Sequence, residues 1–95
     1  MEVQEAYKQK LAAQLHEWSA QIDLWEAKAE NAGADMRVKQ AEALRELRVK
    51  QYAAIDKMHE IEKASGEAWD QVKITADQIW EELKAGVAEA HSKFK

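Results

Sequence analysis

The stretch LHEWSAQIDLWEAKA, residues 15–29, decides the fold class. Within it, Leu15, Trp18, Ile22 and Trp25 recur at steps of three and four residues. That spacing lines one side of an α-helix, whereas a half-buried strand alternates every second residue. The same spacing extends along most of the chain, which contains no proline. The sequence therefore predicts an all-α protein whose apolar stripe must be covered by another helix.

The composition limits the size and kind of core. The chain has 95 residues, at most one small domain, and we expect a single helical coiled-coil domain over 1–95. Hydrophobic residues make up 46%, but many of these are alanine, and charged residues make up 34%. This mixture is typical of long helices and coiled coils. Because large apolar side chains are few, we predict that copies of the chain associate into a homo-oligomeric bundle.

Glycines are the main signals for helix ends in this chain. Across Gly33 the stripe continues through Gln40 to Leu44 without moving to another helix face, which predicts one long amphipathic helix over about 2–62. The segment 62–68 has no large apolar side chain, and Ser65 is a candidate N-cap. We therefore predict a shorter second helix over about 67–92.

Two architectures follow from these helix ends. The long and short helices would form a coiled-coil hairpin that assembles into an oligomeric bundle. The alternative is a three-helix bundle with breaks near Gly33 and Gly66, which divide the chain into near-equal thirds.

The stripe is the predicted seam between copies of the chain. Each large side chain fully buried there stabilises the assembly by about 1.5–3 kcal/mol. Gln40, Gln51 and Ser65 interrupt the stripe and are candidates for fixing its register. On the opposite side, Leu24, Val38, Val49 and Ile74 indicate a second, weaker contact face. The predicted seam residues are Leu11, Leu15, Trp18, Ile22, Trp25, Met36, Leu44, Leu47, Ile55, Met58, Ile61, Trp69, Val72, Ile79, Leu83, Val87 and Phe94.

Four tryptophans are unusual in so short a chain. We interpret them mainly as large core residues in a bundle that is short of leucine and isoleucine. The alternative is contact with a lipid surface, since residues 69–94 are amphipathic with tryptophans at the apolar border. Against it, acids outnumber lysines on the polar side of that segment, while interfacial helices usually have a basic polar face. The candidate lipid-contact residues are Trp69, Trp80, Leu83, Val87 and Phe94.

No catalytic, cofactor-binding or metal-binding pattern stands out. His16, His59 and His91 have no second histidine three or four residues away and no glutamate at the third preceding position. Cysteine is absent, which excludes a thiol nucleophile and a thiolate metal site. We therefore predict a protein that is not an enzyme, with no catalytic residues, metal ligands or cofactors.

Charge and hydropathy indicate partners and location. The formal net charge is −4, and the basic residues of 37–50 are interleaved with Glu42 and Glu46, so nucleic acid is not an expected partner. No apolar run approaches the roughly 20 residues of a membrane span, and no basic-then-apolar leader opens the chain. We expect a cytoplasmic protein.

Several short runs together resemble a known family. KLAAQLHEW (10–18), IDLWEAKAE (22–30) and ASGEAW (64–69), with LKAGV (83–87) and SKF (92–94), look like a family of small bacterial coiled-coil proteins that are sometimes labelled stress-response proteins. The resemblance covers essentially the whole chain and implies a long first helix, a Ser-Gly junction and an amphipathic second helix. The family usually has acids or alanine where this chain has Gly33. It implies no catalytic residue, cofactor or established biochemical activity.

These observations favour a non-enzymatic structural or interaction protein, a self-associating helical bundle that the resemblance links to stress. Its expected partner is a second copy of itself. Two other functions remain open: an adaptor that becomes ordered on binding another protein's helix, and a peripheral protein whose amphipathic helix binds a membrane surface.

Overall fold

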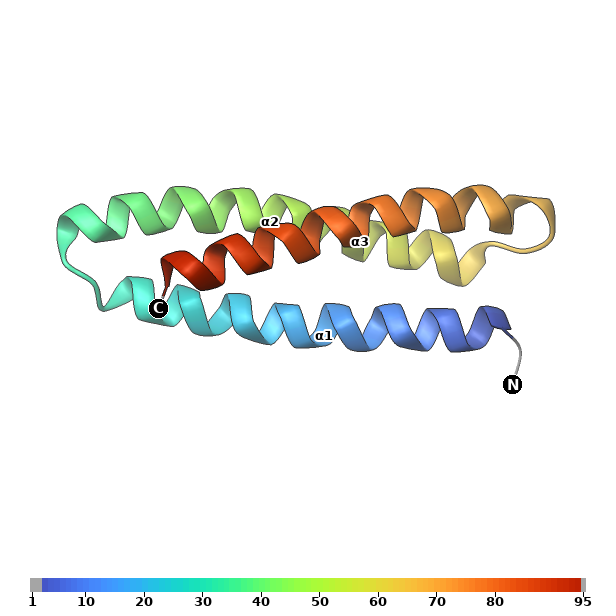
Figure 1. Cartoon of the computed structure of the whole chain (residues 1–95), viewed down its shortest axis with the longest axis horizontal. Coiled ribbons are helices and arrows are strands. Elements are labelled where there is room, and N and C mark those ends of the chain that lie inside the picture. Colours follow the sequence, from blue (N-terminus) through green and yellow to red (C-terminus); the bar gives the residue numbers. More distant parts are fainter. Residues whose placement is uncertain (1–2, 95) are drawn as a thin grey trace.

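Three α-helices packed side by side make up the protein, as the computed structural model of residues 3–94 shows (Figure 1). Helix α1 spans Val3–Glu30, α2 spans Ala34–Lys63 and α3 spans Glu67–Lys93. No strand occurs in this part of the chain, and the bundle measures 51 × 21 × 18 Å. The all-α prediction is confirmed, and the architecture is the three-helix alternative with breaks near Gly33 and Gly66.

Helix α2 runs antiparallel to both of its neighbours, so α1 and α3 run parallel to each other (Figure 1). The backbone of α2 lies close to both α1 and α3, whereas α1 and α3 meet mainly through large side chains. Gly86 allows part of this close approach, because a Cβ there would lie only 3.2 Å from Leu47 Cδ1. Alternating short turns at the two ends therefore set the topology.

The prediction of one continuous helix over 2–62 is wrong. The helix ends at Glu30 and restarts at Ala34 after a turn of three residues. The apolar stripe has the same phase on both sides of the turn, but phase does not distinguish the two arrangements, since both halves must face one core in either case. Folding back at Gly33 buries the stripe of α1 within the same chain and needs no second copy.

The second break lies where the sequence predicts it, and α3 begins at Glu67 as expected. Gly66 has φ 58° and ψ −127°, a backbone conformation that is open to glycine and strained for other residues. The predicted N-cap is wrong, because Gly66 and not Ser65 occupies that position, and no side-chain hydrogen bond caps the helix. Backbone geometry at Gly66 therefore makes this turn.

The core runs the length of the bundle between the three helices. Ile22, Ile61 and Leu83 are its largest fully buried side chains, and each helix contributes one of them. Among residues 3–94, no helix is both long and apolar enough to cross a membrane. The buried apolar residues are Leu11, Ile22, Trp25, Ala29, Leu44, Leu47, Ala54, Ile61, Trp69, Ala76, Trp80, Leu83, Val87, Ala90 and Phe94.

Candidate functional site

The predicted seam coincides largely with the core of a single chain. Buried within the bundle are Leu11, Ile22, Trp25, Leu44, Leu47, Ile61, Trp69, Leu83, Val87 and Phe94. Partly buried and packed against them are Leu15, Trp18, Met58, Val72 and Ile79, and Ile55 is also partly buried. Met36 alone among the predicted seam residues is exposed, at 50% of its surface. The stripe of this chain thus packs mainly against itself.

All five candidate lipid-contact residues are buried as well: Trp69, Trp80, Leu83, Val87 and Phe94. A lipid surface would reach them only if α3 left the bundle. The interpretation of the tryptophans as core residues agrees with the structure for Trp25, Trp69 and Trp80, and Trp18 is partly buried.

Aromatic contacts fill the space between the parallel helices α1 and α3. The rings of Trp25 and Phe94 stack with centroids 5.7 Å apart, near one end of the bundle. Near the other end, Tyr7 meets Trp69 edge-to-face at 5.6 Å. Between them, Trp80 Nε1 donates a hydrogen bond to the carbonyl oxygen of Leu11 at 3.2 Å. Large rings therefore bridge two helices whose backbones stand apart.

Tyr7 is also the centre of a polar cluster that ties α1 to α3. Its hydroxyl donates to the carboxylate of Asp77, and Lys73 Nζ lies 5.2 Å from the centre of its ring. Lys73 Nζ is 3.6 Å from Asp77 Oδ2. Burial raises the pKa of Tyr7, and the hydrogen bond to Asp77 and its negative charge add to the effect. The phenol therefore stays protonated at any physiological pH.

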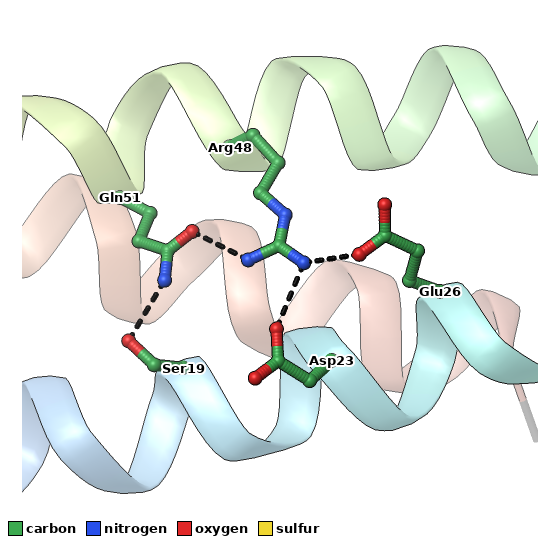
Figure 2. A network of polar contacts seen from close by, with 5 residues as sticks. All are labelled: Ser19, Asp23, Glu26, Arg48 and Gln51. Atoms are coloured by element: carbon green, nitrogen blue, oxygen red, sulfur yellow. Dashed lines mark hydrogen bonds and ion pairs between the residues drawn. The ribbon is translucent and has the colours of Figure 1, made fainter.

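A second polar network joins α1 to α2 (Figure 2). Gln51 is the one buried polar residue of the described chain, with 6% of its surface exposed. Its Nε2 donates to Ser19 Oγ at 2.8 Å, and its Oε1 accepts from Arg48 Nη1 at 2.8 Å. Arg48 Nη2 donates to Asp23 Oδ1 at 2.8 Å and to the carboxylate of Glu26. Both hydrogen-bonding groups of Gln51 are thus satisfied in this register of the two helices.

Electrostatics in this network favour the charged guanidinium. Burial by itself lowers the pKa of Arg48, but hydrogen bonds to Asp23 and Glu26 and the charges of these two residues outweigh it, so the net pKa is raised. Both carboxylates are more than half exposed, so the ion pairs contribute little stability. Their effect is to align the helices, and the sequence signal for them was Gln51, a polar residue in the apolar stripe.

Apolar side chains also remain on the solvent side of the helices. Val38, Val49 and Tyr52 lie on the outer face of α2 at spacings of eleven and three residues, with 63%, 63% and 59% of their surfaces exposed. At 3.6 residues per turn these three side chains, here termed the outer row, share one helix face. Leu24 and Ile74 are exposed singly on α1 and α3. The outer row contains two of the residues that the sequence assigned to a second contact face, Val38 and Val49.

No metal-binding cluster of three or more histidine and carboxylate side chains occurs within residues 3–94. His16, His59 and His91 are exposed on three different helices. Neither a scan against protein-family models nor comparisons with curated proteins and solved structures gave a match for this chain.

Proposed function

We propose that this protein is a non-enzymatic helical interaction protein that binds a second copy of itself through the outer row of α2. The observation that carries the proposal is the row itself: Val38, Val49 and Tyr52 project from one face of a well-packed helix, away from the core that the same helix builds. Isolated exposed apolar residues are normal on protein surfaces. Three in line along one helix favour contact with another helix, as in helix-to-helix recognition generally.

The charges beside the row favour an antiparallel second copy. If two α2 helices pack antiparallel with Val49 of each against the partner's Tyr52, Arg45 faces the partner's Asp56. The same register places Glu42 opposite the partner's His59. All four of these polar side chains are exposed, and Arg45 and Asp56 form no ion pair with any other described residue. The arrangement is self-complementary, as a two-fold symmetric interface requires.

The size of the contact predicts weak association. Residues 42–59 of α2 extend for about 26 Å, and a helix face is about 10 Å wide, so each copy covers roughly 260 Å². That area is well below the ~800 Å² per partner of a standard stable interface. We therefore expect a concentration-dependent dimer with a dissociation constant in the range of about 0.1–1 mM.

Sedimentation equilibrium over a wide range of protein concentration tests the proposal. The wild-type chain should approach the mass of a dimer at the highest concentrations. Val49→Asp should lower the association constant at least tenfold, because it places a charge against the partner's apolar side chain. Ile74→Asp is the matched control, since Ile74 is exposed to a similar extent but lies on α3 outside the row. A wild-type protein that stays monomeric at about 1 mM would refute the proposal.

Charge reversal tests the register. Arg45→Asp alone and Asp56→Arg alone each place like charges opposite each other in the two-fold dimer, and each should weaken it. The double variant restores both pairs and should dimerise like the wild type. If the double variant is as weak as the single variants, the antiparallel register is wrong.

A further inference from the structure

We propose that two copies of this chain also exchange α1. In the exchanged dimer the turn at residues 31–33 becomes helical, α1 and α2 join into one helix over 3–63, and α1 packs on α2 and α3 of the partner copy. This goes beyond the proposed function, because the exchanged surface is the core face of α1 and not the outer row of α2. The dimer then repeats the core contacts of the bundle between two chains.

The phase of the core residues permits the joined helix. Met36 follows Ala29 by seven residues and Gln40 follows it by eleven. At about 100° per residue, both return to within about 20° of the direction of Ala29. Ala29 is buried in the core, at 6% exposure. A helix that runs straight through Gly33 therefore keeps the core face of α1 in line with that of α2.

The two turns of the bundle differ in how firmly they are built. Gly33 has φ −64° and ψ 162°, an extended conformation that any residue adopts, and a Cβ placed there would have nothing within 4 Å. No side-chain hydrogen bond caps the start of α2 at Gly33. Gly66, by contrast, has a positive φ of 58° that fixes its turn. Hence the α2–α3 hairpin is the stable unit, and α1 is the helix that can leave.

The bonds that hold the first turn are few and exposed. Asn31 Nδ2 donates to the carbonyl oxygen of Ala27 at 3.2 Å. Arg37 Nη2 donates to the carbonyl oxygens of Glu30 and Ala32 at 2.9 and 3.3 Å. A continuous helix supplies the same carbonyls with main-chain N–H donors four residues further on. Straightening the turn therefore leaves no helix-end carbonyl without a partner.

Met36 gains a contact in the exchanged dimer that it lacks in the bundle. It lies on the core-facing stripe of α2, yet half of its surface is exposed beside the turn. Ser19 packs against Gln51 in the bundle, so residues equally far from position 35 face each other along α1 and α2. If the exchanged dimer keeps that pairing between chains, its two-fold axis passes near residue 35. Met36 then packs against the partner's Met36.

The distance between two sites on one chain distinguishes the exchanged dimer from other dimers. Glu17 and Ala53 are exposed on α1 and α2, and both lie two residues from the Ser19–Gln51 contact, so they are level in the bundle. Spin labels there should be within about 20 Å in the bundle, because packed helix axes are about 8–10 Å apart. In the joined helix, 36 residues separate them, which gives about 54 Å.

The experiment uses the full chain, whose lack of cysteine allows specific labelling. A Glu17→Cys/Ala53→Cys chain is spin-labelled, mixed with a tenfold excess of unlabelled chain, unfolded, and refolded at high concentration. Dilution leaves only distances within one chain, which pulsed electron–electron double resonance then measures in the isolated dimer fraction. We expect a population near 54 Å. A dimer with the short distance alone overturns the exchange but keeps the proposed function, and a protein without any dimer removes both proposals.

Two substitutions at one position make a matched pair. Gly33→Ala should increase the exchanged dimer about tenfold, because alanine is the better helix former in both joined helices. Gly33→Pro should abolish the 54 Å population, because proline breaks a helix interior, while its fixed φ near −65° suits the closed turn. The Gly33 N–H donates no backbone hydrogen bond within the described chain, so proline removes none there. Equal dimer populations in wild type, Gly33→Ala and Gly33→Pro would overturn the exchange, and circular dichroism checks that each variant folds.

Discussion

Replacing Leu83 by alanine is the most direct test of the core of this bundle. Leu83 is fully buried on α3, with 0% of its surface exposed. The change removes three carbon atoms from the core and leaves a cavity, and such substitutions at fully buried leucines lower the free energy of unfolding by about 3 kcal/mol. A domain of this length has a total stability of roughly 5–14 kcal/mol, so the loss is a large fraction of it. The midpoint of thermal unfolding should fall by about 15 °C.

Leu24→Ala is the matched control for this prediction. It is the same substitution in a helix of the same bundle, but Leu24 is 54% exposed and projects away from the core. We expect it to change the free energy of unfolding by less than about 0.5 kcal/mol. Urea and thermal denaturation followed by circular dichroism at 222 nm measure both variants. Equal losses for Leu83→Ala and Leu24→Ala would refute the assignment of the core.

Three further predictions concern the polar contacts and the second turn. Arg48→Ala should lower the free energy of unfolding by about 1 kcal/mol in urea titrations, since it removes a hydrogen bond from buried Gln51, whereas the unpaired Arg45→Ala should have almost no effect. Because the pKa of Tyr7 is raised above its ordinary value of 10, its contribution is complete below pH 10 and is lost as the pH rises above it. The stability difference between wild type and Tyr7→Phe should therefore shrink between pH 9 and pH 11 in urea titrations, and an unchanged difference would contradict the assigned contact. Gly66→Ala should lower the melting midpoint by an amount equivalent to about 1–3 kcal/mol, while Gly33→Ala leaves the monomer close to wild type.

Helix content could be predicted from this sequence, because steps of three and four residues report directly on which face of a helix is apolar. The break at Gly66 could be predicted too, since the residues around it contain no large apolar side chain. The break at Gly33 could not be decided, because the stripe keeps one phase whether the helix continues or folds back. What decides it is the burial that α1 gains against α2, a contact between residues far apart in sequence.

The contacts between helices show the same limit. Spacings of seven and eleven residues place Trp18 with Trp25, and Trp69 with Trp80, on shared helix sides, which is local information. The stacking of Trp25 on Phe94 depends on α1 and α3 lying parallel, and nothing in either helix alone specifies that. Likewise, the polar residue Gln51 marked an irregularity in the stripe, but its partner Ser19 lies on another helix.

The odd number of helices has a mechanical consequence. With three antiparallel passes, Val3 and Phe94 lie at opposite ends of the 51 Å long axis (Figure 1). A tensile load applied between them acts along that axis, so α1 must slide past its neighbours while many side-chain contacts bear the force together. A bundle with both ends on one side would instead be pulled apart contact by contact. This geometry therefore suits a short spacer that resists stretching.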